Sequence, residues 1–279
     1  MAYNFKIARV GLHYYEEPCI SGENGSGTIF FSGCTLKCKF CQNYNISQNN
    51  YGIDIDGETL KKCMLYLQEQ GAHNINLVTP ALYVNGLVEV LKEIKDSLRI
   101  PVLWNSSGFE SVASIEKLKG LVDIFLPDYK YSDDALAEEL SNAKGYSNIA
   151  YNAIAKMREN CPQDEFDNLG LIKRGVIVRH LVLPGQVNNS LGVLDKIAKI
   201  DKNMYVSVMS QYFPTENVKN NPKLNRRITK KEYEEVINHF FDIGLINGFS
   251  QDVSSAIEDY VPDFDLINLI NLLKTLELK

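Results

Sequence analysis

The fold is decided by the stretch Thr28-Ile29-Phe30-Phe31-Ser32-Gly33-Cys34-Thr35-Leu36-Lys37-Cys38-Lys39-Phe40-Cys41, in which a β-prone apolar run leads into three cysteines. The run predicts a short strand ending at Gly33, with the CxxxCxxC motif in the loop that follows. Four protein ligands close a structural zinc site, whereas three thiolates leave one iron of an iron–sulfur cluster open to a small molecule. We therefore expect a cluster. The alternatives are three reduced cysteines, or a zinc site completed by His13, His73 or Cys19.

Strands alternate with helices along the remainder of the chain. Apolar runs predict strands at 28–31, 74–79, 100–104, 122–126, 176–182 and 204–209. Helical patterns predict helices at 60–67, 82–98, 115–118, 133–142, 149–160 and 191–200. Six such alternations imply a parallel sheet with right-handed crossovers, so we expect an α/β fold built as a six-stranded open barrel. In a single domain of 1–279, the core barrel is expected at about 26–215 and a helical extension at about 228–279.

Bulk composition fits one enzyme domain. The chain has 279 residues, of which 45% are hydrophobic, and this is enough to bury one large core. The net charge of −6 argues against nucleic acid as a partner, and no apolar run approaches the ~20 residues that span a membrane. Three of the six cysteines lie in one motif, which fits a reducing, cytoplasmic compartment better than a disulfide framework. An amphipathic C-terminal helix containing Leu266, Leu269 and Leu273 is expected to close the core or a subunit contact.

Polar residues follow the predicted strands, at the edge where the sites of parallel α/β sheets gather. Thr79 and Pro80 end the second strand, and Thr79 is either a cofactor contact or simply a strand-stopping residue. Asn105 and Ser106 follow the third strand in a turn whose amide and hydroxyl groups suit hydrogen bonds to a ribose or a carboxylate. We therefore include Thr79, Asn105 and Ser106 among the candidate cofactor-binding residues.

Two cationic side chains, Arg179 and His180, lie on the fifth strand. Burying a cation is costly unless it has a partner, and period-2 alternation sends these two side chains to opposite faces. Either Arg179 points into the barrel, where it could hold a carboxylate, or His180 does. Gln211 at the end of the sixth strand is a candidate for substrate contact. Cys19 is either a substrate-side thiol that donates a hydrogen atom or an ordinary buried cysteine.

The motif Cys34-x-x-x-Cys38-x-Phe40-Cys41 resembles that of the radical S-adenosylmethionine enzymes. The runs at 13–22 (HYYEEPCISG) and 25–34 (GSGTIFFSGC) are similar to the PflX-type branch, relatives of the pyruvate formate-lyase activating enzyme. The resemblance covers His13 to Tyr212 and implies a partial (β/α)6 barrel. It also implies that the three cysteines bind three irons of a 4Fe–4S cluster, while S-adenosylmethionine chelates the fourth. In such oxidoreductases the reduced cluster cleaves S-adenosylmethionine to a 5′-deoxyadenosyl radical, which takes a hydrogen atom from the substrate.

The same resemblance implies further cofactor contacts. Activating enzymes carry an Asp-x-Lys at the end of the fourth strand, in contact with S-adenosylmethionine, and Asp128 and Lys130 match it. Phe40 and Gln42 are expected to frame the adenine, with Asn105 near the ribose and the methionine. The Gly-Gly-Glu stretch of many superfamily members is missing after the second strand, so the contact to the methionine amino group has no assigned residue.

Resemblance to activating enzymes implies a protein or peptide substrate, for example a partner enzyme that receives a glycyl radical. It also implies a low-potential electron donor such as flavodoxin or ferredoxin. Within the superfamily, the alternative is radical modification of a small molecule or a ribosomal peptide. Outside it, the alternative is a non-catalytic zinc or iron–sulfur protein that senses redox state.

Overall fold

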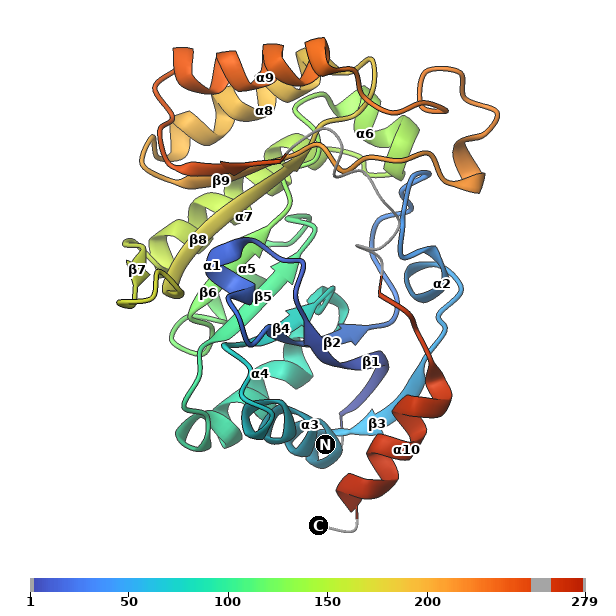
Figure 1. Cartoon of the computed structure of the whole chain (residues 1–279), viewed down its shortest axis with the longest axis vertical. Coiled ribbons are helices and arrows are strands. Elements are labelled where there is room, and N and C mark those ends of the chain that lie inside the picture. The colour runs from blue at the N-terminus through green and yellow to red at the C-terminus, as the bar shows by residue number, and fades with distance from the viewer. Residues whose placement is uncertain (1–2, 252–261, 278–279) are drawn as a thin grey trace.

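A sheet of ten strands forms the body of the molecule in the computed structural model, which describes residues 3–251 and 262–277 (Figure 1). The strands are β1 (Asn4–His13), β2 (Ser26–Phe31), β3 (Ile53–Asp56), β4 (Ile75–Val78), β5 (Val102–Ser106), β6 (Ile124–Pro127), β7 (Glu165–Phe166), β8 (Ile172–Leu181), β9 (Tyr205–Met209) and β10 (Gly248–Ser250). Their order is β10-β9-β8-β6-β5-β4-β2-β1-β3, and β7 pairs with β8 off this path. The strands at the two ends of this order, β10 and β3, do not pair with each other within the described residues, so the barrel is open.

All neighbours from β2 to β10 along this order are parallel, as the strand–helix alternation predicts. The expected α/β fold with a partial, open barrel is therefore confirmed. The sequence analysis missed the antiparallel extension, in which β1 pairs with both β2 and β3. It also missed β10, a three-residue strand that adds a seventh parallel member beside β9.

Helices cover the outer face of the sheet (Figure 1). They are α3 (Gly57–Glu69), α4 (Val84–Ile94), α5 (Val112–Glu116), α6 (Asp134–Ser141), α7 (Tyr146–Asn160), α8 (Val187–Ile200) and α9 (Lys230–Asp242). Short helices are α1 (Pro18–Ser21), α2 (Tyr44–Ser47), η1 (Ala81–Tyr83), η2 (Lys95–Ser97) and η3 (Glu216–Val218). The helix expected at 82–98 is thus divided among η1, α4 and η2. The C-terminal α10 (Leu266–Glu277) contacts α3 and β1, and its Leu269, Leu273 and Leu276 are buried, as its amphipathic pattern predicts.

The two faces of the sheet bury different sets of side chains. Trp104, Phe125 and Val178 belong to the large core between sheet and helices. The residues next to them in sequence, such as Leu103 and Ile177, point to the opposite face and pack with Cys19 and Ile20 of α1. Helix α1 therefore fills the lower part of the barrel, and the polar residues one pleat further along the same strands lie above it.

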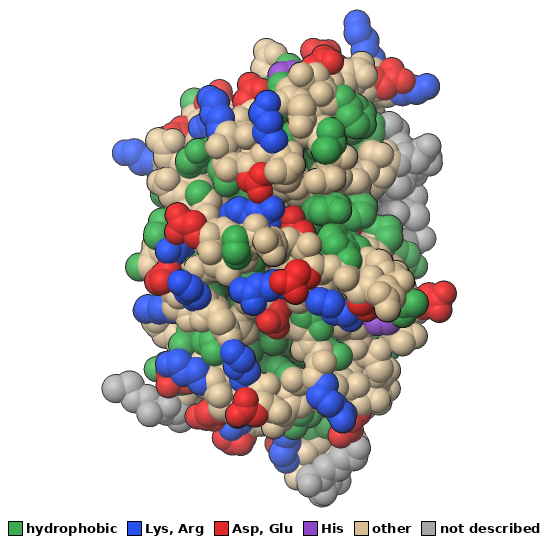
Figure 2. Space-filling model, turned by 90° about the vertical axis from the view of Figure 1, so that its left-hand side faces the viewer, with side chains coloured by type: hydrophobic (Ala, Val, Ile, Leu, Met, Phe, Trp, Pro, Cys, Tyr) green, Lys and Arg blue, Asp and Glu red, His purple; other side chains and the backbone are tan. Residues whose placement is uncertain are grey.

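On the face shown in Figure 2, basic and acidic side chains are interspersed. Within the described ranges, none of the helices combines the length and the hydropathy needed to cross a membrane. Part of the expected extension at 228–279, namely residues 252–261 and 278–279, lies outside the described residues, and the division into barrel and extension stays a prediction.

Candidate functional site

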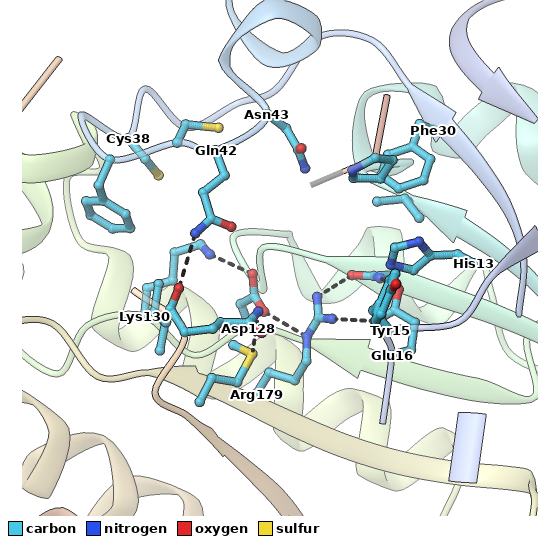
Figure 3. A pocket seen from close by; sticks show the side chains of 18 residues that line it. His13, Tyr15, Glu16, Phe30, Cys38, Gln42, Asn43, Asp128, Lys130 and Arg179 are labelled. Atoms are coloured by element: carbon cyan, nitrogen blue, oxygen red, sulfur yellow. Dashed lines mark hydrogen bonds and ion pairs between the residues drawn. The ribbon is translucent and has the colours of Figure 1, made fainter. Parts of the chain in front are cut away.

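A pocket opens at the carboxyl ends of the parallel strands (Figure 3). The loop after β2 contributes one wall, the segment after β1 contributes the opposite wall, and the ends of β6, β8 and β9 form the floor. The lining residues are His13, Tyr15, Glu16, Phe30, Cys38, Phe40, Cys41, Gln42, Asn43, Val78, Asn105, Asp128, Lys130, Arg179, Leu181, Met209, Gln211 and Pro262. This is the edge at which ligand sites of parallel α/β sheets occur.

The cysteine loop is fixed in place by the end of helix α6. The backbone N–H groups of Lys37 and Lys39 donate to the carbonyl oxygens of Ser141 (2.9 Å) and Leu140 (2.8 Å). These carbonyls belong to the last turn of the helix, which lacks intrahelical donors for them. The Ser141 hydroxyl also donates to the Cys38 sulfur at 3.0 Å. A loop without regular structure thus acquires a defined shape from a helix that lies far away in the sequence.

The thiols of this loop are partly enclosed. Burial raises the pKa of Cys38 to about 12, against the opposing effect of the Lys130 charge, and burial also raises the pKa of Cys34. Metal binding at these sulfurs would therefore displace protons. Because Ser141 donates to Cys38, the hydroxyl of Tyr131, 2.6 Å from that of Ser141, donates to Ser141 in turn. If Cys38 binds a metal, such a chain would orient this ligand from outside the first coordination sphere.

The donor set fits an iron–sulfur cluster. Three thiols are soft ligands of the kind that bind such clusters. Among the described residues, His, Cys, Asp and Glu side chains do not converge in a group of three or more around one metal ion. A cluster does not require that convergence, because each thiolate binds a different iron. Close by, the buried Oδ1 of Asn43 has no hydrogen-bond partner within the described part of the chain, and the residue lines the pocket. A bound ligand with an N–H group would satisfy this oxygen.

Arg179 is the hub of the pocket floor. Its Nε donates to Asp128 Oδ1 (3.1 Å), and its two terminal nitrogens donate to Glu16 Oε2 (3.0 Å) and Asn105 Oδ1 (2.6 Å). Asp128 accepts a second bond from Lys130 Nζ at 2.6 Å. Burial alone would raise the pKa of Asp128, but the charges of Lys130 and Arg179 outweigh it and hold that pKa below its ordinary value. Asp128 is therefore ionised at neutral pH.

Strand alternation places His180 on the other side of the sheet. Its Nδ1 lies 2.7 Å from the Tyr129 carbonyl oxygen and its Nε2 lies 2.8 Å from the Ser190 hydroxyl. A carbonyl only accepts, so Nδ1 carries the proton and Nε2 accepts from Ser190. Burial lowers the pKa of His180 to about 4, so the ring is neutral at neutral pH. Of the two alternatives left open by the sequence, the structure turns Arg179 into the barrel.

Most of the residues singled out from the sequence come together in this pocket. Eight line it: Cys38, Phe40, Cys41, Gln42, Asn105, Asp128, Lys130 and Arg179. Cys34 is partly buried beside them but is not a lining residue. Gln211 also lines the pocket, and its carbonyl oxygen accepts from Gln42 Nε2 at 3.4 Å.

Besides Cys34, three candidates lie outside the pocket lining. Ser106 has the same orientation as Trp104 on its strand, and both side chains donate to the buried carboxylate of Glu110. Thr79 has a left-handed φ of 59°, which is rare for a β-branched residue, and its N–H donates to the Asn105 carbonyl at 2.9 Å. Cys19 is buried in the apolar cluster around α1, which agrees with the prediction that it is an ordinary buried cysteine.

Sequence reasoning missed the wall formed by His13, Tyr15 and Glu16. His13 is the last residue of β1 and the other two follow it, and the antiparallel pairing of β1 with β2 brings them over the carboxyl ends of the parallel strands. Burial, followed by the charges of Arg9 and Arg179, lowers the pKa of His13 to about 4. The run at 13–22 resembles the PflX-type branch, but apart from His13 and Cys19, which the sequence offers as ligands of an alternative zinc site, neither spacing nor composition assigned a role to Tyr15 or Glu16.

Comparison with known proteins gives one family match and one sequence relative. Residues 20–151, which include all three motif cysteines, match a model described as a 4Fe-4S single cluster domain. The uncharacterized protein MJ0674 of Methanocaldococcus jannaschii is 33% identical over 222 residues, or 76% of this chain. The chain spans only 61% of the length of that relative.

Solved structures share the fold at low sequence identity. SuiB of Streptococcus suis, bound to precursor peptide SuiA, aligns with a TM-score of 0.56 at 12% identity, over 85% of this chain and 52% of SuiB. Methylornithine synthase (PylB) aligns with a TM-score of 0.52 at 16% identity, over 88% of this chain and 79% of that protein. The match to the single-cluster domain includes the three motif cysteines, and these solved structures share the fold of this chain.

Proposed function

We propose that this chain is a radical S-adenosylmethionine enzyme of the activating-enzyme type, which takes a hydrogen atom from a protein or peptide. The observation that supports this function is a convergence of residues from distant parts of the sequence. Cys38 and Cys41, from the loop after β2, face the same pocket as Asp128 and Lys130 from the end of β6. In this proposal the two pocket cysteines and Cys34 hold the cluster.

When bound, the two cofactors supply a reducing electron and a strong hydrogen-atom acceptor. The chain's own residues bind and orient them. Lys130 presents a compact cation suited to the methionine carboxylate, and Asp128 holds it through the 2.6 Å ion pair. The unpartnered Asn43 Oδ1 is an acceptor for an amino group, a contact that the missing Gly-Gly-Glu stretch leaves open. Phe40 packs against Tyr212 with ring centroids 6.1 Å apart and covers this side of the pocket against water.

The substrate and the electron donor are proposals drawn from resemblance. Activating enzymes act on a partner protein, and SuiB, on the same fold, is described as bound to a precursor peptide. Both support a polypeptide substrate. Modification of a ribosomal peptide is the second candidate, and a flavodoxin or ferredoxin is the proposed electron donor.

An anaerobic assay tests the proposal. The protein is reconstituted with iron and sulfide and reduced, and 5′-deoxyadenosine is then measured after addition of S-adenosylmethionine, with EPR spectra before and after. We expect product and a changed cluster signal from the wild type, and neither from Cys34→Ala, Cys38→Ala or Cys41→Ala. Cys63→Ala, in the buried face of α3, is the matched control and should retain both. Product formation at the wild-type rate by a motif variant, or zinc in place of iron, would contradict the proposal.

A second measurement addresses the substrate. The reduced enzyme is mixed with a candidate partner enzyme and S-adenosylmethionine, and the EPR spectrum is recorded. A glycyl doublet supports the activating type. Turnover of a peptide without that doublet supports peptide modification instead.

A further inference from the structure

Glu16 belongs to none of the motifs that carry the proposed chemistry, yet this residue of the pocket wall contacts Arg179 of the pocket floor. Its side chain is 10% exposed, and both of its oxygens are used. Oε1 accepts from the side-chain amides of Asn76 (3.0 Å) and Asn105 (3.3 Å), and Oε2 accepts from Arg179 (3.0 Å). One carboxylate thus ties together the inner faces of β4, β5 and β8.

This arrangement fixes the direction of Arg179. The guanidinium donates to Asp128 on one side and to Glu16 and Asn105 on the other, so its plane is determined by three partners. Without Glu16, Asn105 would lose the acceptor of its N–H group, and Arg179 would lose one of its two carboxylates. A guanidinium with several hydrogen-bond partners takes its direction from those partners rather than from its own side-chain torsions. Without Glu16, the guanidinium of Arg179 would therefore be free to turn toward the pocket.

Charge balance is the second consequence. The described residues that line the pocket include two cations, Lys130 and Arg179, and two carboxylates, Asp128 and Glu16. His13 also lines it but is neutral at neutral pH, because burial and then the charges of Arg9 and Arg179 lower its pKa to about 4. S-adenosylmethionine carries a sulfonium, an ammonium and a carboxylate, and therefore a net charge of about +1. A pocket with an uncompensated arginine would repel it.

We propose that Glu16 is a positioning residue, which aims Arg179 and Asn105 and cancels one cationic charge, so that the pocket accepts a positively charged sulfonium cofactor. The inference rests on the proposed function, since it takes S-adenosylmethionine as the ligand. It assigns a role to the first glutamate of the Glu-Glu-Pro run after β1, and it predicts that the pocket distinguishes ligands by the charge on sulfur.

Equilibrium dialysis with the reconstituted enzyme tests this role without requiring turnover. The two probes are S-adenosylmethionine and S-adenosylhomocysteine, which has the same amino-acid and nucleoside groups but a neutral sulfur. In Glu16→Gln, which keeps the shape and removes the charge, S-adenosylmethionine should bind about tenfold more weakly, while S-adenosylhomocysteine changes by less than about threefold. Glu16→Asp retains the charge and should restore the preference for the sulfonium.

Two controls separate this role from simple damage. Glu23→Gln removes an exposed carboxylate beyond α1 and should bind both ligands as the wild type does. Thermal unfolding of each variant shows whether it is folded. Equal weakening for both ligands in a folded Glu16→Gln, or no weakening, overturns the inference and leaves the proposed function intact. Failure of the wild type to bind S-adenosylmethionine refutes the proposed function, and the inference with it.

Discussion

Asp128→Asn removes a carboxylate that forms ion pairs with both Lys130 and Arg179, and we expect it to destabilise the fold. Asp128 accepts from Lys130 Nζ at 2.6 Å and from Arg179 Nε at 3.1 Å, and its side chain is 19% exposed. A hydrogen bond to a charged group contributes roughly 1.5–3 kcal/mol, and removing one partner of a buried ion pair costs roughly 3–5 kcal/mol. Asparagine keeps one acceptor, and Arg179 keeps Glu16, so we expect a loss near the lower bound, roughly 3 kcal/mol.

The assay is thermal unfolding followed by circular dichroism. For a chain of this size, 1 kcal/mol shifts the midpoint by roughly 2–4 °C, so the variant should unfold roughly 6–12 °C below the wild type. Asp96→Asn, at an exposed position in η2, is the matched control and should stay within about 0.5 kcal/mol. A midpoint for Asp128→Asn within 2 °C of the wild type would refute the view that this carboxylate holds the pocket floor together.

The pH dependence gives the same prediction a second check. Lys130 and Arg179 hold the folded-state pKa of Asp128 below its unfolded value of about 3.9. At a pH between the folded-state and the unfolded-state pKa of Asp128, the unfolded state binds more protons than the folded state. The free energy of unfolding therefore rises with pH in this range. The contribution is fully present above the unfolded pKa and is lost as pH falls through the folded pKa. The difference in stability between wild type and Asp128→Asn should therefore be constant above about pH 5 and shrink only below about pH 4.

Three other predictions concern single residues. Because burial holds the pKa of His180 at about 4 rather than its ordinary 6.5, the folded state binds fewer protons in that window. Stability should fall by up to about 1.4 kcal/mol per unit as pH decreases through it, and urea midpoints at pH 7 and pH 5 should differ less in His180→Gln. Gly33→Ala places a Cβ 2.9 Å from Leu82 at a φ of +88°, and should cost about 1–2 kcal/mol and lower the iron content after reconstitution. Gly71→Ala, at a similar φ with open space around it, controls for backbone strain alone, and equal iron loss in both would rule out the steric explanation. Cys19→Ala should keep full iron content and 5′-deoxyadenosine yield, and a loss of product at unchanged iron content would show that this thiol takes part in the reaction.

The six parallel strands other than β10 were predictable because each is a buried apolar run with a helix after it. β1 was missed because Lys6 and Arg9 interrupt its apolar residues, and because its pairing is antiparallel with strands on both sides. Such a strand owes its place to its neighbours rather than to its own pattern. The three residues of β10 are too few to produce a periodic signal.

For the site, the strand-end rule selected Asn105, the resemblance to activating enzymes selected Asp128, and the cost of burying a cation selected Arg179, but none of these gave the directions of the side chains. Alternation along the strand decides that Asn105 faces the pocket and Ser106 faces Glu110. That choice needs the register of the sheet, which the sequence does not state. The place of Glu16 in the pocket could not be predicted for a further reason, since it depends on β1, a strand that the sequence pattern did not reveal.

The contact between the cysteine loop and α6 sets an order of events during synthesis. Cys38 and Ser141 are separated by 103 positions, and translation at about 5–20 residues per second makes the thiol several seconds before the hydroxyl that orients it. A nascent chain that stops short of α6 therefore carries all three cysteines but lacks the helix end that shapes their loop. If the loop holds the proposed cluster, we expect its insertion to be a late step, which follows the folding of the central strands.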